Sequence, residues 1–111
     1  MKYTEINLEI GMPPAADAMR YLQDAISRLK REKYGCVLII HGYGSTGKGG
    51  VIKRKARSWL NAQVRNGTLK TVINGEDFGI FNFKALELKN KCRELEEFLD
   101  AGNEGVTVVE L

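Results

Sequence analysis

Residues 36–60 read CVLIIHGYGSTGKGGVIKRKARSWL, and this stretch decides the fold. It begins with a continuous apolar run, Cys36–Ile40, that has the length of a strand. Such a run is typical of a central strand that is covered on both faces. A glycine-rich loop follows, and apolar residues then recur at helical spacing over residues 51–63. We therefore predict a buried strand, a loop at its carboxyl end and an amphipathic helix.

The residues before this stretch predict another strand and another helix. Residues 3–10 alternate between apolar and polar side chains, which is typical of a half-buried outer strand. After Pro13 and Pro14, apolar residues recur every three or four positions up to Leu29, which predicts an amphipathic helix that Gly35 ends. A strand, a helix and a second strand form a βαβ unit, so the two strands should be parallel.

The residues after it complete the pattern of a small α/β protein. We predict a third strand over residues 68–73, a helix over 83–99 and a final strand over 106–111. The order β-α-β-α-β-(α)-β predicts a two-layer α/β sandwich. No repeat, linker or low-complexity tract interrupts the chain, so we expect a single domain over residues 1–111.

Charge is spread unevenly along the chain, although the net charge is only +3. Residues 41–74 contain seven lysines and arginines and no acid, whereas residues 75–111 contain nine acids and four bases. A basic block of this kind attracts polyanions such as nucleic acids. The alternative is a solvated basic helix face without a ligand.

Several classes of protein and site are disfavoured. No apolar run approaches the roughly 18 residues of a membrane-spanning helix, and the N-terminus lacks the apolar core of a signal peptide. We therefore expect a cytoplasmic protein without a membrane partner. With two cysteines, Cys36 and Cys92, one histidine and no CxxC motif, we expect free thiols, no metal site and no cofactor.

The glycine-rich loop has two interpretations. Gly42 to Lys48 fits the first seven positions of a nucleotide-binding P-loop, but Gly49 stands where a serine or threonine would hold magnesium. A phosphodiester backbone fits better, because glycines and a helix N-terminus present backbone N–H groups to an anion. Hydroxyl groups in the loop can donate to phosphates, and its tyrosine can stack on a base. The residues expected to contact nucleic acid are Gly42, Tyr43, Gly44, Ser45, Thr46, Gly47, Lys48, Lys53, Arg54 and Arg57.

His41 is the only histidine and lies where the buried strand meets this loop. In open α/β sheets, ligands usually bind outside the carboxyl ends of the strands. The imidazole can donate to a phosphate or act as a general acid or base near neutral pH. Alternatively, it only orders the loop through a hydrogen bond.

These residues give the chain a resemblance to the Smr domain, the small MutS-related domain. The motif HGxG after an apolar strand appears as residues 41–44, the following basic helix is similar, and GNEGVTVVEL resembles the family's last turn and strand. The segment GEDFGIFN looks like a variant of short bacterial members. The resemblance implies a mixed four-stranded sheet similar to the C-terminal domain of a bacterial translation initiation factor. It also implies nucleic-acid binding and, as in several members, endonuclease activity.

The first motif of the family, LDxHG, is altered in this chain. Residues 8–12 stand in its place, so that Glu9 replaces the aspartate and Gly11 replaces the histidine; a shift by two residues would place Asn7 and Glu9 there instead. Cleavage would then depend on His41 and Glu9 as catalytic residues, although Glu9 is otherwise an exposed strand carboxylate. We predict a protein that binds the backbone of RNA or DNA, with endonuclease cleavage as a further prediction. The alternative is a protein-interaction module that has lost nucleic-acid binding.

Overall fold

The computed structural model describes residues 1–43 and 47–111, with only the backbone described for residues 47–49. Its sheet has four strands in the spatial order β1-β2-β4-β3. The strands are β1 (Tyr3–Asn7), β2 (Cys36–Ile40), β3 (Thr71–Asn74) and β4 (Val106–Glu110). As predicted, β1 and β2 are parallel, while β4 is antiparallel to both β2 and β3. This confirms the α/β class and the mixed four-stranded sheet.

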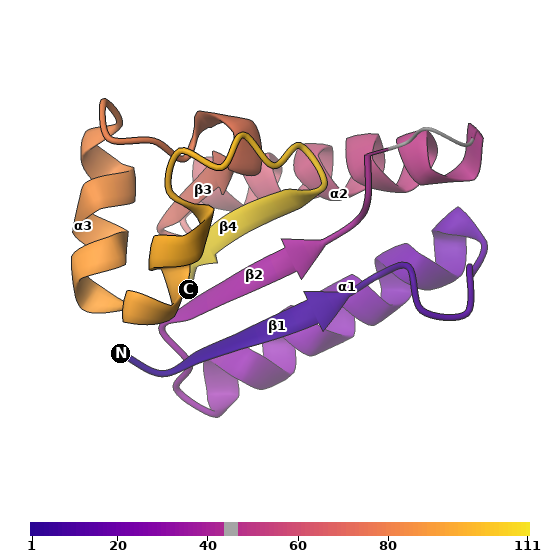
Figure 1. The fold of residues 1–111 in the computed structure, drawn as a ribbon. Helices are drawn as coiled ribbons and strands as arrows, with labels where there is room; N and C mark the ends of the chain where they lie inside the picture. Colours follow the sequence, from indigo (N-terminus) through magenta and orange to yellow (C-terminus); the bar gives the residue numbers. More distant parts are fainter. Residues whose placement is uncertain (44–46) are drawn as a thin grey trace.

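Helices α1 (Ala15–Arg31) and α2 (Gly47–Arg65) cover one face of the sheet, behind the strands in Figure 1. The apolar stripe of α1 is buried, as its spacing predicts, and it shares a core with Val37 and Ile39 of β2. Helix α1 ends before Gly35, however. Lys33 takes a left-handed φ of 66°, so a lysine occupies the conformation that the sequence pattern assigns to glycine.

The opposite face is covered by a 3₁₀ turn, η1 (Gly75–Asp77), a short helix, α3 (Phe83–Lys91), and a second 3₁₀ segment, η2 (Arg93–Phe98). The predicted helix over 83–99 was wrong in extent, because Cys92 is extended, with φ −136° and ψ 95°, and breaks it. Buried side chains of these elements, including Phe78, pack against Leu38 and Val108 of the sheet. The sheet therefore has a second core under residues 75–99.

Both cysteines lie in this second core as free thiols, which confirms that part of the sequence interpretation. Burial raises the pKa of the Cys36 thiol to about 12. A thiol is nucleophilic only as the thiolate, so Cys36 is an inert core residue at neutral pH. Within the described residues, no helix is long and apolar enough to cross a membrane.

Strand β1 is shorter than predicted, ending at Asn7 instead of Ile10. The side chain of Asn7 accepts a hydrogen bond from the backbone N–H of Glu9 at 2.9 Å, which starts a turn. Ile10 is consequently 76% exposed and does not join the core. Glu9 therefore lies on a turn beside the end of β2.

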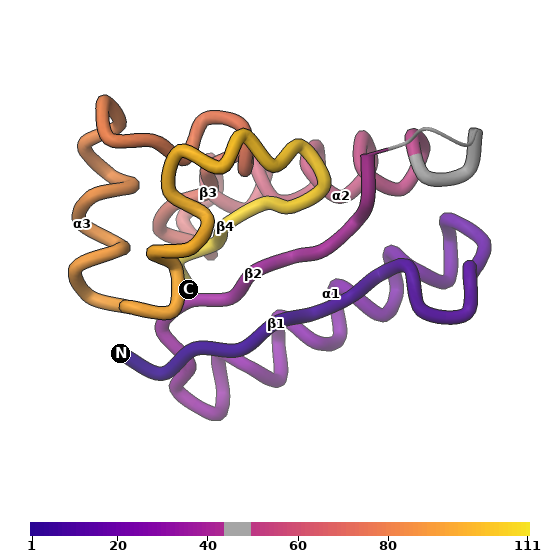
Figure 2. The backbone as a smooth tube through the Cα atoms, viewed as in Figure 1, coloured from indigo at the N-terminus to yellow at the C-terminus, as the bar shows by residue number. Residues whose placement is uncertain are grey.

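The chain path brings the two termini to one end of the strands and the glycine loop to the opposite end (Figure 2). The backbone of Leu111 bonds to Gly35, which in turn bonds to Lys2. The carboxyl end of β2 lies at the far end of the molecule, next to the start of α2. The glycine loop therefore follows β2 at this end of the sheet, away from the two termini.

The second core can be tested with two phenylalanines of one loop. Phe78 is 1% exposed, whereas Phe81 is 99% exposed. We expect Phe78→Ala to lower the free energy of unfolding by about 3–5 kcal/mol, because it leaves a cavity. Phe81→Ala should change it by less than about 0.5 kcal/mol. Urea denaturation of both variants measures this, and equal effects would contradict the packing described here.

Candidate functional site

The site is built at the carboxyl end of β2, where the chain runs into His41 and Gly42. The backbone N–H groups of both residues donate to the carbonyl of Gly105, each at 3.0 Å. This carbonyl precedes β4, so the start of the loop is tied to the neighbouring strand. Of the residues predicted to bind nucleic acid, Gly44, Ser45 and Thr46 and the side chain of Lys48 lie outside the described part of the structure.

Helix α2 begins at Gly47, four residues before the predicted start at Val51. The loop before this helix is therefore shorter than predicted, and the backbone from Gly47 onward belongs to the first turns of α2. No acidic residue occurs in the first turn. The partial positive charge of the helix N-terminus is thus not offset by a carboxylate of its own helix.

His41 is fully buried, with 0% of its surface exposed. Its Nδ1 lies 2.9 Å from the carbonyl oxygen of Gly42, and its Nε2 lies 2.8 Å from the hydroxyl of Thr107. A carbonyl only accepts, so Nδ1 carries the proton and donates to Gly42. The neutral imidazole then accepts at Nε2 from the Thr107 hydroxyl. Both ring nitrogens are engaged, which is the arrangement of a histidine that orders the loop.

The surroundings of His41 keep it neutral. Burial lowers its pKa to about 4, and the charges of Arg57 and Lys53 act in the same direction, against the hydrogen bond to Gly42. The imidazole is uncharged at neutral pH and has no exposed nitrogen. A direct contact of His41 with a phosphate would need a rearrangement of this loop.

Arg57 of α2 completes the same network. Its Nε donates to the Thr107 hydroxyl at 3.0 Å, and its two terminal nitrogens form a bidentate pair with Glu76 of η1, at 2.9 and 2.7 Å. A terminal nitrogen also reaches the backbone carbonyl of Val106 at 3.1 Å. The hydrogen bond from Arg57 holds the pKa of the Glu76 carboxyl below its usual value.

The sequence predicts that Arg57 contacts nucleic acid, but the structure gives its guanidinium these protein partners. Only 13% of its side chain is exposed. Arg57 therefore joins α2 to η1 and β4, and its contact with nucleic acid stays a prediction. Thr107 and Glu76 are residues of the site that sequence reasoning missed. The one signal in the sequence was a threonine among the three valines of residues 106–109.

Glu9 reaches the site from the turn after β1. A Cβ at Gly42 would overlap with a carboxylate oxygen of Glu9, so this carboxylate lies directly against the Gly42 backbone. Gly42 also has a φ of 81°, a conformation that favours glycine. The structure thus brings Glu9 and the HG pair of residues 41–42 together, with Glu9 exposed and His41 buried.

Tyr43 lies on the outer side of the site and is 63% exposed. A Cβ built on Gly105 would lie 3.3 Å from the ring, so the ring packs against this backbone. One side of the tyrosine is supported and much of the rest faces solvent. A supported, exposed aromatic ring of this kind can stack on a nucleic-acid base.

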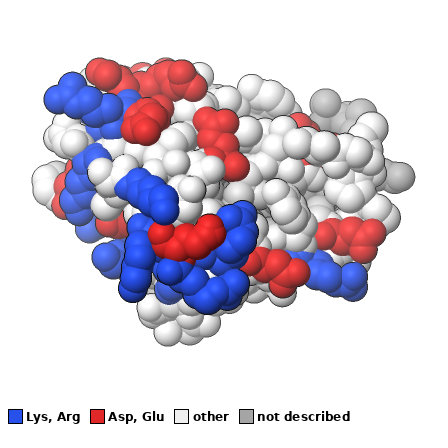
Figure 3. All heavy atoms as spheres, turned by 90° about the horizontal axis from the view of Figure 1, so that it is seen from below, with Lys and Arg blue, Asp and Glu red and all other residues white. Residues whose placement is uncertain are grey.

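The basic residues of α2 divide into two groups. Arg54 and Lys55 are exposed, whereas Lys53 is half-buried and close enough to lower the pKa values of both His41 and Glu76. Lys53 therefore faces the network and Arg54 faces solvent. Positive charge is not limited to α2, since lysine and arginine also gather, with acids among them, on the face seen from below (Figure 3).

A pocket of about 310 Å³ lies beside the Glu9 turn. Its lining is mainly apolar and includes Leu8, Ile10, Pro13 and Tyr21. Within residues 1–43 and 47–111, no group of three histidine, cysteine, aspartate or glutamate side chains is placed to hold a metal ion.

Comparisons with known proteins give a family and a fold for this chain. A model of the Smr domain family matches residues 10–72. The chain is similar to the Smr domain of MutS2 from Thermus thermophilus, a crystal structure, with a TM-score of 0.56 and 17% sequence identity over 100% of this chain and 98% of that one. At this identity the structural likeness shows the fold alone. No curated protein sequence matches the chain significantly.

The conformation of Gly42 gives one prediction. We expect Gly42→Ala to lower the free energy of unfolding by about 1–2 kcal/mol, because an alanine at positive φ is strained. Gly67→Ala is the matched control, since Gly67 has a φ of 84° and nothing within 4 Å of an added Cβ. If Gly42→Ala lowers the free energy of unfolding more than Gly67→Ala does, the additional loss should disappear in the double variant Gly42→Ala/Glu9→Ala. An unchanged stability of Gly42→Ala would show that the loop start is not held in this conformation.

The buried imidazole gives a second prediction. Between pH 6.5 and 4 the unfolded chain protonates its histidine before the folded protein does, so stability should fall by about 3 kcal/mol over this range. This contribution is fully present above pH 6.5. Chemical denaturation at a series of pH values measures this, with His41→Asn expected to make the loss of stability between pH 6.5 and 4 smaller by about 3 kcal/mol. Proton NMR of the single histidine should show no titration near pH 6.5, and a midpoint there would contradict the buried network.

Proposed function

Because the chain belongs to the Smr domain family, we propose that it binds RNA or DNA through the phosphate backbone, with residues 1–111 acting as one domain. The observation that carries this proposal is the start of α2. A helix N-terminus without an acidic first turn follows a glycine-rich loop at the carboxyl end of the central strand. Backbone N–H groups and the helix dipole together favour a bound phosphate at such a point.

Side chains around the loop extend this interface. We assign phosphate contacts to Lys53 and Arg54, and to Lys48 and the hydroxyl groups of Ser45 and Thr46 from the sequence. Tyr43 would stack on a base. Arg57 and His41 would support binding indirectly, because their hydrogen bonds to Thr107 and Gly42 fix the position of the loop.

Endonuclease cleavage is the second candidate function, favoured by the contact between Glu9 and Gly42. An exposed carboxylate at the end of β2 can act as a general base toward a phosphodiester bound at the loop. In this proposal Glu9 and His41 are the catalytic residues, and His41 would need to leave its bond with Thr107 to reach the substrate. Binding does not depend on this rearrangement.

The binding proposal predicts a steep dependence on salt. Fluorescent single-stranded RNA, single-stranded DNA and duplex DNA should all bind at low salt and dissociate as salt rises, measured by anisotropy. We expect Lys53→Ala/Arg54→Ala to weaken binding. On a single strand, the slope of log K against log salt should become shallower by about 0.7 for each phosphate that the variant no longer neutralises. Lys89→Ala/Arg93→Ala removes the same charge from the α3–η2 segment and should have a much smaller effect.

The same samples test cleavage on denaturing gels. Loss of cut products in Glu9→Gln, with binding retained, would support the nuclease. Intact strands that nevertheless bind would leave a nucleic-acid-binding domain without this chemistry. Absence of binding at low salt to all three probes would contradict the proposal and favour the protein-interaction module.

A further inference from the structure

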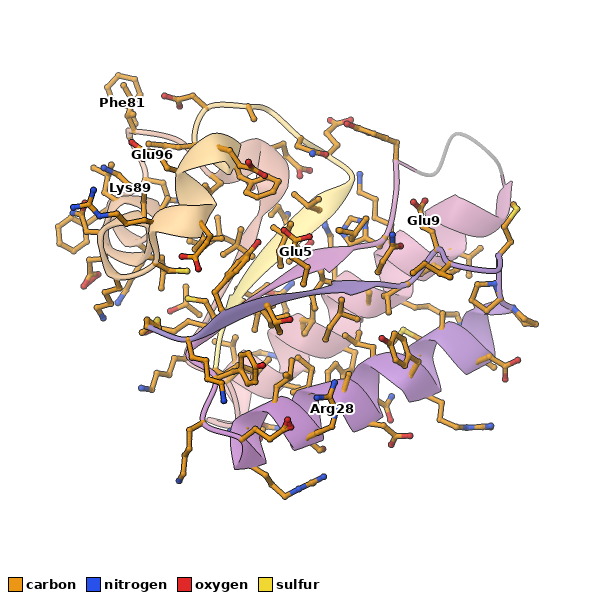
Figure 4. The ribbon with its side chains drawn as sticks, turned by 60° about the horizontal axis from the view of Figure 1, so that its bottom comes forward. Glu5, Glu9, Arg28, Phe81, Lys89 and Glu96 are labelled. Carbon is orange, nitrogen blue, oxygen red and sulfur yellow. The ribbon has the colours of Figure 1, made fainter. Side chains whose placement is uncertain are left out.

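The loop between η1 and α3, together with Phe83 at the start of α3, exposes an unusual amount of apolar surface. Phe81 is 99% exposed, Phe83 is 75% exposed and Ile80 is 49% exposed. Single exposed apolar residues are common on protein surfaces, but three within four residues concentrate apolar surface in one short segment. Phe81 projects away from the body of the molecule in Figure 4, at the opposite end from Glu9. We call residues 79–83 the aromatic loop.

The aromatic loop is held by hydrogen bonds. The backbone N–H of Ile80 donates to a carboxylate oxygen of Asp100 at 3.1 Å, and that of Asn82 donates to Gly79 at 3.0 Å. The side chain of Asn82 also donates to the carbonyl of Asp77 and accepts from Ala85, capping α3. These bonds fix the loop in the conformation that exposes Phe81.

The fixed conformation of the aromatic loop keeps the ring of Phe81 exposed. A flexible loop could fold its phenylalanine back against the protein, whereas this one keeps the ring in water. A ring held in advance in an exposed position loses little conformational freedom when a partner covers it. Aromatic side chains of this kind provide much of the binding energy in protein interfaces.

A hollow of about 490 Å³ lies between the aromatic loop and residue 100. Six residues line it, namely Asp77, Gly79, Phe81, Asn82, Phe83 and Asp100. Two of these six are carboxylates and none is a lysine or arginine. The α3–η2 segment that follows contains four acids and four bases, so the excess of negative charge is local to the hollow, at Asp77 and Asp100.

The charge of the hollow decides which kind of partner fits. Acids beside an apolar surface repel the phosphates of nucleic acids and attract cations. The nearest base in the sequence, Lys84, is itself in an ion pair with Glu87 at 3.4 Å. A partner must therefore offer an apolar side chain to the rings and a positive charge to the carboxylates.

We infer that the aromatic loop is a docking site for a protein segment that presents an apolar side chain next to a lysine or arginine. The apolar group packs between Phe81 and Phe83, and the cation lies against Asp77 and Asp100. This site is separate from the proposed nucleic-acid interface, so both can be occupied at once.

The test is a selection from phage-displayed random 12-residue peptides on the immobilised full chain. We expect enriched peptides to combine apolar residues with lysine or arginine. Their affinities, measured with labelled synthetic peptides, should fall about tenfold or more in Phe81→Ser. Asp77→Asn/Asp100→Asn should reduce affinity about threefold to fivefold, because rim charges contribute modestly. The asparagine at position 100 can still accept the hydrogen bond from Ile80, so the loop is kept.

Tyr43→Ser is the matched control, because it removes an exposed aromatic ring at the other end of the molecule. It should leave peptide binding unchanged, and Phe81→Ser should leave nucleic-acid binding unchanged. The inference is overturned if no peptide is enriched, if enriched peptides are acidic, or if they bind Phe81→Ser as well as the unmodified chain. Concentration-dependent dimers in sedimentation that Phe81→Ser abolishes would assign the loop to a second copy of the chain and also overturn it.

Discussion

One hydroxyl group, that of Thr107, holds the end of the sheet together. It accepts a hydrogen bond from Arg57 and donates one to His41, so it joins α2, β4 and the end of β2. Thr107 and His41 are fully buried, and a buried polar group without a partner is costly. The position of His41 fixes the Gly42 carbonyl, and the position of Arg57 fixes Glu76. The shape of the glycine loop at its start therefore depends on a residue outside the loop.

Much of the fold was predictable because strong periodicity leaves few alternatives. The apolar run of β2 and the apolar stripe of α1 are found where the sequence places them. The errors are at ends of elements, where single contacts decide. Asn7 ends β1 by bonding to its own turn, Lys33 ends α1 in a left-handed conformation, and Cys92 divides the helix after the aromatic loop. None of these three effects has a periodic signal in the sequence.

The site was predictable only in part, for a related reason. The sequence places His41 and the basic helix correctly at the carboxyl end of β2, since both follow from the strand–loop–helix order. It does not reveal that Arg57 pairs with Glu76, nor that Thr107 bonds to His41 across 66 positions of the chain. Long-range polar contacts depend on the order of the strands in the sheet. The spacing of residues within β4 predicts a strand but does not predict which strands lie beside it. The same limit hid the burial of His41, because burial depends on which strand lies beside it.

The position of β4 has a consequence for how the protein is made. Of the four strands, β4 comes last in the chain, yet it lies in the interior of the sheet between β2 and β3. During synthesis, β1 and β2 can pair early, but β3 has no neighbour in the sheet until β4 arrives. Thr107 arrives with β4, so its hydrogen bonds to His41 and Arg57 can form only after the other three strands have been made. Assembly of the loop is thereby coupled to completion of the sheet.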